Sequence, residues 1–423
     1  MGSEWIETTV GDFCPFQYGK SLPERNRVPG PYPVIGSSGP IGSHREPLVR
    51  EPGIVIGRKG TVGAVHFSKS PFWPIDTTFY VISAEHRDLR FTYYLLQSLG
   101  LDRMNADSAV PGLNREAAHA RKILVPPLPE QRAIAHILGT LDDQIELNWR
   151  KNETLEAMAQ AIFKSWFVDF DPVVVNAIKA GNPIPEKFAE RAAHYRENPD
   201  ALGLSEHILC LFPDHFQESE LGPIPEGWKV KFLDQIAHFQ NGLALQKYRP
   251  QLGESRLPVV KIAQLRTGRS DGTEWASANI RPECIIDDGD VVFSWSGSLL
   301  VKIWCGGRAA LNQHLFKVTS QEYPKWFYYG WIQEHLLQFV LIASDKATTM
   351  GHIKRHHLSE AGCVVPDRTL LEAADALFAS LLEEQIRCEL ESRTLVALRD
   401  TLLPKLISGE LRVLDMAKIL EAM

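Results

Sequence analysis

Apolar positions spaced alternately by three and four residues define the most regular stretch of the chain, between Pro129 and Trp166. Such a repeat, kept over about four heptads, is typical of a helix that lies along another helix. Pro129 is expected in the first turn of this helix, where a missing N–H is tolerated. A second stretch, from Thr369 to Lys405, has the same rhythm. The pattern therefore predicts two long helices that pair with each other.

The seam expected of these helices is mainly aliphatic, with two amides in the first helix. Asn148 and Asn152 cost stability at seam positions, and their usual role is to fix register and partner. The alternative interpretation is a buried helix of an ordinary globular domain, which the length and the polar seam disfavour. The residues expected to pair the helices are Leu138, Leu141, Ile145, Asn148, Asn152, Leu155, Ile162, Leu377, Leu381, Leu395, Leu398 and Leu402.

The sequence also contains an internal duplication. Each helix follows a short apolar strand that ends in proline, at Pro126 and again 240 residues later at Pro366. The segments before these strands match at one offset of 223, with Trp5, Phe16 and Gly19 answered by Trp228, Phe239 and Gly242. Runs rich in β-branched or aromatic residues, each followed by a glycine-containing turn, come next in both halves. Matches that keep their order predict two homologous halves, each a globular head followed by a helix.

These patterns divide the chain into five parts. The connector between the halves is rich in proline and acidic residues, with one short amphipathic segment at 186–196. After the second helix, the segment Pro404 to Val413 is expected to pass back toward the first head. The expected divisions are residues 1–128 for the first head, 129–168 for the first helix, 169–223 for the connector, 224–366 for the second head, and 367–423 for the second helix and the return.

Composition and charge narrow the class of protein. A hydrophobic content of 44% and a charged content of 23% are those of a globular protein. The net charge of −7 divides unevenly: the heads carry 14 Lys and Arg against 12 Asp and Glu, and 16 against 13, while the remainder carries 15 against 27. This asymmetry indicates heads that can approach a polyanion. Six cysteines without ligand spacing, no signal sequence and no long apolar run predict a cytoplasmic protein without a membrane segment.

Motifs that would indicate catalysis are missing from the sequence. It contains no phosphate-binding Gly-x-x-x-x-Gly-Lys-Ser/Thr loop, no His-Glu-x-x-His, no Asn/Asp-Pro-Pro-aromatic tetrad and no acidic residue two before a lysine. His352, His356 and His357 suggest a metal site, but the basic pair between them, Lys354 and Arg355, favours a loop near phosphate or base edges. Three aspartates at 287, 288 and 290 are expected to form a turn before a strand. We therefore expect no catalytic residues and no metal.

Both heads place basic and hydrogen-bonding side chains in glycine-punctuated loops between strands. These residue types contact base edges and phosphates, although a single Arg or Ser in a loop more often only faces solvent. Four tryptophans, at 275, 295, 304 and 331, are expected in the core and not as stacking platforms. The DNA-binding candidates are Ser37, Ser38, Arg58, Lys59, Thr61, Asn114 and Arg115 in the first head, and Lys261, Gln264, Arg266, Ser296, Ser298, Lys302, Gln313, His314, His352 and Lys354 in the second.

Several motifs together resemble the specificity subunit of type I restriction–modification enzymes. They are Pro-Pro-Leu-Pro-Glu-Gln-Arg at 126–132, Ile-Phe-Lys-Ser-Trp-Phe-Val-Asp-Phe-Asp-Pro at 162–172, Glu-Leu-Gly-Pro-Ile-Pro-Glu-Gly-Trp at 220–228, and Thr-Thr-Met-Gly-His-Ile-Lys at 348–354. The resemblance covers essentially the whole chain. One departure is that Pro366 is followed by Asp-Arg-Thr-Leu-Leu and not by a second Pro-Leu-Pro-Glu-Gln.

This resemblance implies a fold, a function and partners. The fold would be of the α+β class, with two homologous α/β target-recognition domains separated by two long helices that form an antiparallel coiled coil, in a pseudo-twofold arrangement. The chain would be a non-catalytic subunit that reads a bipartite double-stranded DNA site and directs adenine methylation and restriction. Its partners would be two methyltransferase subunits, which carry the S-adenosylmethionine, with motor–nuclease subunits completing the restriction enzyme. The chain itself would hold no cofactor.

Two other functions are left open by the residues. The chain could serve as a coiled-coil assembly scaffold whose heads bind protein, or as an enzyme with an unfamiliar site. Salt-sensitive binding to a bipartite duplex separates the first of these from DNA reading, and methyl transfer by the chain alone would establish the second. A helix of about 37 residues spans about 55 Å, enough to bridge major-groove half-sites about 34–36 Å apart. The helices are therefore expected to set the spacing between the half-sites.

Overall fold

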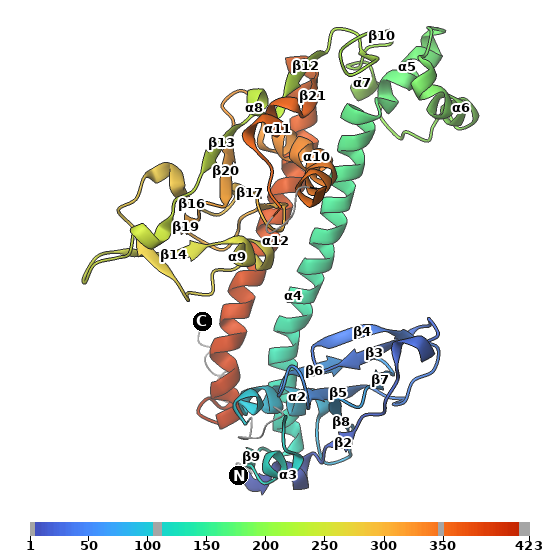
Figure 1. The fold of residues 1–423 in the computed structure, drawn as a ribbon. Coiled ribbons are helices and arrows are strands. Elements are labelled where there is room, and N and C mark those ends of the chain that lie inside the picture. The colour runs from blue at the N-terminus through green and yellow to red at the C-terminus, as the bar shows by residue number, and fades with distance from the viewer. Residues whose placement is uncertain (1–4, 105–111, 346–350, 414–423) are drawn as a thin grey trace. The chain divides into compact units, whose positions relative to one another are not determined.

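The structure is a computed structural model that describes residues 5–104, 112–345 and 351–413. The chain forms two compact units, one made of residues 1–146 and 394–423 and the other of residues 147–393. Each unit contains one sheet-rich lobe and parts of two long helices (Figure 1). The sequence motif at 348–354 begins outside the described residues.

The first lobe is closed by pairing its first strand with its last. Strand β1 (Ile6–Thr9) runs antiparallel to β9 (Lys122–Val125), with Ile6 opposite Val125. Between them lie a four-stranded sheet of order β2-β8-β5-β6 and a three-stranded sheet of order β4-β3-β7. The strands are β2 Gln17–Tyr18, β3 Tyr32–Gly36, β4 Gly39–His44, β5 Gly53–Gly57, β6 Val65–Ser68, β7 Trp73–Pro74 and β8 Thr78–Ile82, and the helices are α1 Val10–Phe13, α2 Leu89–Ser98 and α3 Arg115–His119, with short 3-10 turns η1 Glu24–Asn26 and η2 Leu101–Arg103.

Strand β5 is the centre of this lobe because all five of its residues are buried. Its Gly-Ile-Val-Ile-Gly sequence fits a strand covered on both faces, where a continuous apolar run replaces alternation. Ile54 and Ile56 pack with Phe79 and Phe91 in one core, which also takes in Leu138 of the first long helix. The lobe and that helix therefore share a hydrophobic core.

The second lobe has the same plan. Strand β12 (Lys229–Phe232) pairs antiparallel with β21 (Gly362–Val365). The enclosed sheets have the orders β13-β20-β17-β18 and β15-β14-β19-β16. The strands are β13 His238–Asn241, β14 Arg256–Val260, β15 Trp275–Ser277, β16 Ile285–Ile286, β17 Val291–Ser294, β18 Leu300–Ile303, β19 Ala309–Leu311 and β20 Leu315–Thr319, and the helices are α8 Leu233–Ile236, α9 Ile262–Thr267, α10 Lys325–Asp345 and α11 Arg355–Glu360, with 3-10 turns η5 Leu245–Lys247 and η6 Pro282–Cys284.

The strands of the two lobes correspond, except that β16 of the second lobe has no counterpart in the first. The sheet order β2-β8-β5-β6 of the first is repeated as β13-β20-β17-β18 in the second, and the parallel pair β3–β7 is repeated as β14–β19. Each lobe then leads through a short helix and a closing strand into a long helix. The predicted duplication is confirmed, and so is the predicted mixed α and β fold with two sheet-rich domains and long helices.

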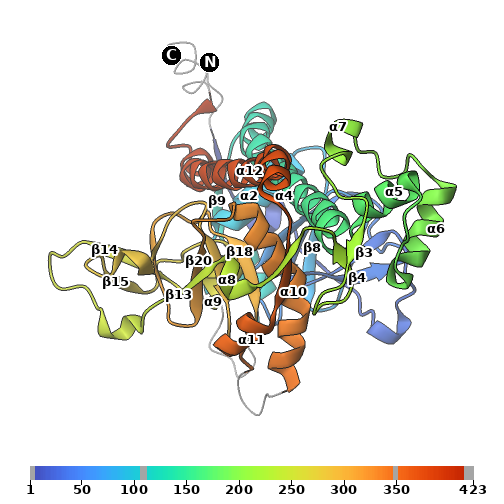
Figure 2. The ribbon, with the colours of Figure 1, turned by 90° about the horizontal axis from the view of Figure 1, so that it is seen from above.

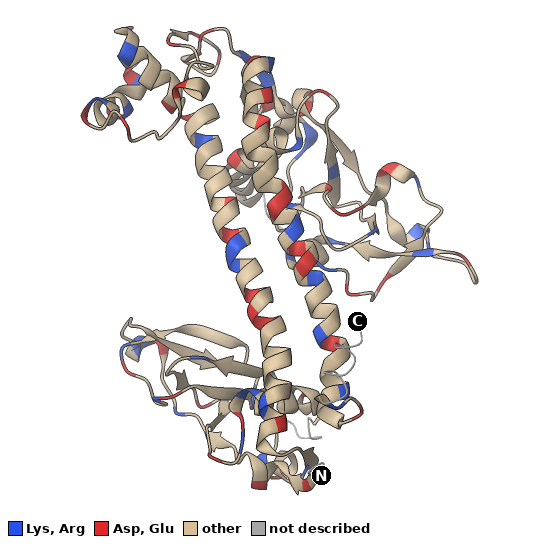
Figure 3. Cartoon of the chain, turned by 180° about the vertical axis from the view of Figure 1, so that it is seen from behind, with Lys and Arg blue, Asp and Glu red and all other residues tan. Residues whose placement is uncertain are grey.

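The long helices are α4 (Leu128–Phe163), which continues into a π-helical turn η3 (Lys164–Val168), and α12 (Arg368–Ser408). In the first unit, Asp142 of α4 accepts a hydrogen bond at 2.8 Å from Arg399 of α12. In the second unit, Lys151 forms an ion pair with Glu384, and the ring of Phe163 contacts that of Phe378. Rising numbers in α4 therefore meet falling numbers in α12, so the helices are antiparallel there. Acidic and basic residues are interspersed along both helices (Figure 3).

The positions expected to pair the helices differ in burial. Leu138 and Asn148 are buried, whereas Leu377 and Leu398 are exposed by 38% and 45%. In the second unit α12 buries Ala374, Phe378 and Leu382, since Trp326 of α10 stacks on Phe378 with ring centroids 4.5 Å apart. The lobe, and not only the partner helix, therefore selects the buried face of α12. The remaining positions are half-buried: Leu141, Ile145, Asn152, Leu155, Ile162, Leu381, Leu395 and Leu402.

The connector contains more helix than its proline content suggests. It forms α5 (Asp171–Ala180), a 3-10 turn η4 (Glu186–Phe188), α6 (Ala189–Glu197), α7 (Glu206–Leu209) and a hairpin of β10 (Phe216–Gln217) with β11 (Ile224–Pro225). Figure 2 shows α5, α6 and α7 grouped on the side of the second unit away from β14 and β15. Phe167, Phe170 and Phe212 surround Trp228, so the connector packs on the start of the second lobe.

The end of the described chain returns to the first lobe, as predicted. Arg412 donates to both carboxylate oxygens of Glu130, at 2.8 and 2.9 Å. Its guanidinium also lies over the ring of Trp5, whose indole N–H donates to Glu130. Among the described residues, no helix combines the length and the apolar composition needed to cross a bilayer.

Candidate nucleic-acid interface

In the first lobe, the candidates lie around the turn that follows β5. Gly60 adopts a positive φ of 79° within this turn, and the N–H of Gly63 closes it by donating to the Gly57 carbonyl. The N–H of Leu113 donates to the carbonyl of Arg58, which joins the turn to the segment before α3. Residues about 55 apart in sequence are thereby brought to one surface.

Arg58 and Arg115 meet on the ring of Tyr18. The guanidinium carbons lie 5.5 and 5.0 Å from the ring centroid, and Arg58 also lies 5.9 Å from the ring of Phe79. Arg58 donates to the carbonyl of Asp76 at 2.8 Å. Arg115 donates to Glu116, and this hydrogen bond raises the pKa of the guanidinium. The cluster combines two cations with an aromatic ring that is 52% exposed.

The other first-lobe candidates have different surroundings. Ser37 is buried, and its hydroxyl donates to the carbonyl of Thr77 at 2.8 Å. Asn114 caps α3 by accepting from the N–H of Ala117. Ser38, Lys59 and Thr61 are exposed. Lys59, which follows Arg58, therefore adds a third positive charge to this surface.

In the second lobe, the corresponding turn follows β17. Trp295 is half-buried there, with its ring 5.9 Å from His314 and 6.4 Å from His352. The hydroxyl of Ser296 and Nδ1 of His314 share a hydrogen bond of 3.0 Å, and Ser296 forms a β-bridge with His352. Three candidates from distant parts of the sequence are thus assembled around one tryptophan.

A small pocket adjoins this group. It has a volume of about 300 Å³ and includes the candidates Lys261, Gln313 and His314 together with Gln246 and Asn312. Amide, imidazole and ammonium groups are the donors and acceptors that discriminate base edges. The lysine forms an ion pair with Glu274. The pocket therefore has the polar lining that base recognition requires.

The remaining second-lobe candidates lie around α9 and β18, except Lys354, which directly precedes α11. Gln264 donates to Asp271 at 2.6 Å, and Lys302 donates to the carbonyl of Arg266 at 2.9 Å. Ser298 and Lys354 are exposed. Neither of these two hydrogen bonds involves Trp295, so the structure gathers only part of the candidate set into one place.

The candidate turns occupy equivalent positions in the two lobes. Gly57 at the end of β5 is opposite Thr78, as Ser294 at the end of β17 is opposite Leu315. Arg58 therefore corresponds to Trp295 and Lys59 to Ser296. The bridge between Lys59 and Gly112 is likewise matched by that between Ser296 and His352. One position in the fold thus carries different chemistry in each half.

Three residues of this surface were not among the sequence candidates. Tyr18 is the last residue of the short strand β2 and gave no motif, Trp295 was expected in the core, and Arg355 lies one residue beyond Lys354. Their signal was the duplication itself, because aligning the halves places Arg355 opposite Arg115. Of the other tryptophans expected in the core, Trp304 and Trp331 are buried, while Trp275 is half-buried under Arg256.

The histidines and aspartates considered as metal ligands behave differently. His356 and His357 group with Glu360, with candidate ligand atoms all within 4.8 Å, and His352 is not part of the group. Nδ1 of His357 accepts from the backbone N–H of Lys354. The aspartates form the predicted turn, and each has a cation: Asp287 pairs with Arg308, Asp288 with Arg393 and Asp290 with Lys317.

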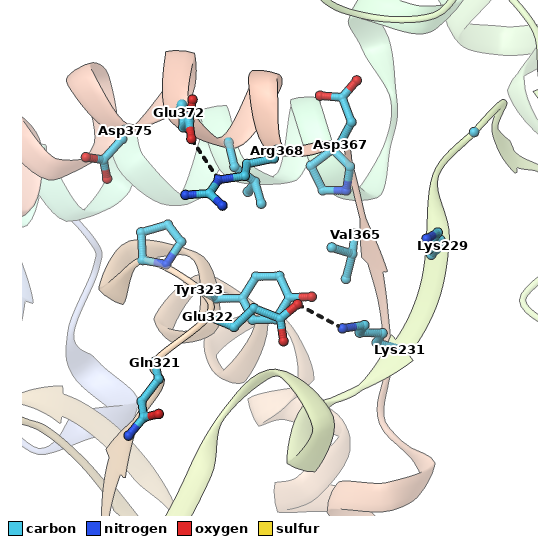
Figure 4. A pocket seen from close by; sticks show the side chains of 14 residues that line it. Lys229, Lys231, Gln321, Glu322, Tyr323, Val365, Asp367, Arg368, Glu372 and Asp375 are labelled. Carbon is cyan, nitrogen blue, oxygen red and sulfur yellow. Dashed lines mark hydrogen bonds and ion pairs between the residues drawn. The ribbon is translucent and has the colours of Figure 1, made fainter.

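A further pocket of about 980 Å³ lies where α12 begins (Figure 4). Its basic side chains include Lys231, paired with Glu322, and Arg368, paired with Glu372. Asp367 and Asp375 also line it. Because carboxylates surround its cations, this pocket is poorly suited to a polyanion and does not extend the interface.

Comparison with known proteins gives a consistent result. Residues 2–157 match the family described as the type I restriction modification DNA specificity domain. The type I restriction enzyme HindI specificity subunit of Haemophilus influenzae is 23% identical over 327 residues, 71% of this chain and 71% of that protein. The MjaIX specificity subunit of Methanocaldococcus jannaschii is 25% identical over 372 residues, 85% of this chain and 78% of that protein.

A solved structure shares the fold. The crystal structure of the type I restriction–modification S subunit from M. genitalium matches with a TM-score of 0.56 at 15% identity, over 95% of this chain and 96% of that one. Residues 2–157 therefore match the type I restriction modification DNA specificity domain, and over most of its length the chain is similar to the specificity subunits of type I restriction enzymes.

Proposed function

We propose that the chain reads a bipartite double-stranded DNA site, one half with each lobe, and performs no chemistry of its own. The observation that carries the proposal is the equivalence of the turns after β5 and β17, which bring cations, imidazoles and hydroxyls to one position in two copies of a fold. Such groups read base edges and hold phosphates. Two readers with different side chains suit a site made of two different halves.

We also propose partners for the reaction. Methylation of adenine would be performed by two methyltransferase subunits that bind S-adenosylmethionine, and cleavage by motor–nuclease subunits where these are present. The relatives are named as specificity subunits of type I restriction enzymes, which supports an assembly of this kind. The chain would act in the cytoplasm, where its DNA substrate lies.

The experiment begins with the target sequence. Methylated adenines are mapped in a host genome with and without this gene, which identifies the two halves of the site. The chain is then assembled with its methyltransferase subunits, and binding is measured on the intact duplex and on duplexes with one half scrambled. We expect specific binding that requires both halves and weakens with salt.

A substitution in one lobe should alter recognition of one half of the DNA site only. Replacing His314 with alanine removes an imidazole from the second-lobe pocket, so the preference for the correct base should relax at one position by about 5- to 150-fold, or about 1–3 kcal/mol. Lys59→Ala in the first lobe is the matched variant for the other half. Methyl transfer by the chain without partners, or an assembled complex that binds no DNA, would refute the proposal in favour of an enzyme or a protein-binding scaffold.

A further inference from the structure

The pair of arginines on Tyr18 is electrostatically unbalanced. Both guanidiniums lie within 5.5 Å of one ring centroid. The ring attracts each cation but does nothing to reduce the repulsion between them. An anion placed between two such groups removes that repulsion and gains charge-assisted hydrogen bonds.

The existing partners leave donors of both arginines available. Arg58 donates only to a neutral carbonyl, that of Asp76, and its Nε is buried without a partner among the described residues. Arg115 uses Nε and Nη2 on one oxygen of Glu116, an exposed carboxylate. Lys59 is exposed beside Arg58. One exposed and two half-buried cations therefore share one carboxylate as counter-charge.

The second lobe does not repeat this arrangement. Trp295 stands where the first lobe has Arg58, and Asn241 stands where it has Tyr18, since both lie opposite equivalent phenylalanines, Phe79 and Phe316. Arg355, the counterpart of Arg115, lies over Phe316 and donates to the carbonyl of Phe239. A single guanidinium, directed to the backbone, replaces the pair.

We propose that Tyr18, Arg58 and Arg115 form a clamp for one phosphate group of the DNA backbone, at the half of the site read by the first lobe, and that the second lobe lacks this clamp. Tyr18 is a positioning residue: its ring holds the two guanidiniums where both can donate hydrogen bonds to the oxygens of the same phosphate. The inference rests on the proposed function and adds an asymmetry to it: the first lobe should bind with the stronger salt dependence.

The test uses the chain assembled with its methyltransferase subunits. The variants are Arg58→Gln, which can still donate to the Asp76 carbonyl, Arg115→Gln and Tyr18→Ala. Each arginine variant should reduce the slope of log K against log salt by about 0.9, the value for one phosphate contact. Tyr18→Ala should weaken binding at least 5-fold, whereas Tyr18→Phe keeps the ring and should bind as the wild type does.

Two further substitutions are expected to change DNA affinity and its salt dependence differently from the arginine variants. Glu116→Gln removes the competing carboxylate and should tighten binding. Arg45→Ala is the matched control, because Arg45 is also exposed and paired with the next residue, Glu46, and it should leave the slope unchanged. Circular dichroism establishes that each variant is folded before it is compared.

Neutral methylphosphonate links, placed one at a time along the duplex, locate the phosphate. One link in the half-site read by the first lobe should weaken DNA binding by the wild type and should cause no further loss of binding in Arg58→Gln. A different outcome is that inorganic phosphate weakens DNA binding while no methylphosphonate link has any effect. That result would indicate a site for a free anion and would overturn the DNA clamp. Unchanged salt slopes would also overturn it, while specific binding by the wild type would leave the proposed function intact.

Discussion

Asp143 of α4 shows how single residues fix the first lobe to its helix. Arg90 of α2 donates to both of its oxygens, at 2.8 and 2.9 Å, and Lys69 donates at 3.0 Å. The Arg90 hydrogen bonds, helped by Lys69, lower the pKa of this carboxyl from 3.8 to about 2. A bidentate arginine fixes geometry as well as energy, so this aspartate sets the angle at which α2 meets α4.

We expect Asp143→Asn to change how stability depends on pH. A carboxyl whose pKa is lower in the folded state stabilises it above about pH 4, and this contribution disappears as the pH falls through about 2. The side chain is 48% exposed, so the loss at neutral pH should stay below about 1 kcal/mol. Urea unfolding from pH 6 to pH 2.5 should show the difference from wild type shrinking as pH falls. A difference independent of pH would contradict this, and Asp102→Asn, an exposed change on the same lobe, serves as the control.

At the scale of residues, Arg58, Arg115, Ser296 and His314 were chosen as candidates because polar residues in glycine-containing loops between strands stand out in a sequence. Their contact with DNA stays a prediction, and the orientation of a candidate could not be predicted. The hydroxyl of Ser37, however, is turned inward to the carbonyl of Thr77, which depends on a strand pairing 40 residues away that no local pattern encodes.

At the scale of elements, two helices can approach closely where one of them has a glycine at the contact. Gly330 of α10 lies against α4, where a Cβ would come within 2.5 Å of the ring of Phe163. That ring also contacts Phe167, Trp331 and Phe378, so it has little room to move. The close approach of α10 and α4 therefore requires glycine at this position.

We expect Gly330→Ala to lower the free energy of unfolding by roughly 1–2 kcal/mol. Overpacking costs about 1–3 kcal/mol, and the better helix propensity of alanine returns up to about 1 kcal/mol. Denaturant unfolding measures the change, with Gln333→Ala on the same helix as the control. In a Phe163→Leu background the alanine should cost less, and an equal cost in both backgrounds would show that the ring is not the obstacle.

Sequence predicted the long helices well because their periodicity is local information. It did not predict α5, since Asp171-Pro172 looks like a turn until Phe170, at a positive φ of 56°, reverses the chain and Pro172 occupies the first turn of a helix. Nor did heptad counting predict that Phe378, and not Leu377, is buried, because Trp326 from another element decides that.

For the whole molecule, the proposed role of the helices is to set the distance between the two half-sites. This role depends on helix length, which is 1.5 Å per residue. Seven residues therefore correspond to about 10.5 Å, or about three base pairs at 3.4 Å each. A heptad also preserves the phase of the seam.

We expect a heptad inserted in both helices to lengthen the recognised spacer by about three base pairs. The insertions would fall between Glu146 and Leu147 and between Arg393 and Thr394, which keeps the pairs Asp142–Arg399 and Lys151–Glu384 intact. Mapping methylated adenines in a host that carries the variant measures the new spacing. A variant that assembles with its partners and methylates the original spacing would disprove the role of helix length.

The strand pairs β1–β9 and β12–β21 place the first and last strands of each lobe side by side. The ends of each lobe are paired in a two-stranded stem, and the residues between Thr9 and Lys122, or between Phe232 and Gly362, also contact the long helices through side chains such as Arg90 and Trp326. An insert of the same fold could therefore replace the residues between the stem strands where it keeps those helix contacts. New target preferences could therefore arise by exchanging whole modules, with no need to rebuild the supporting helices.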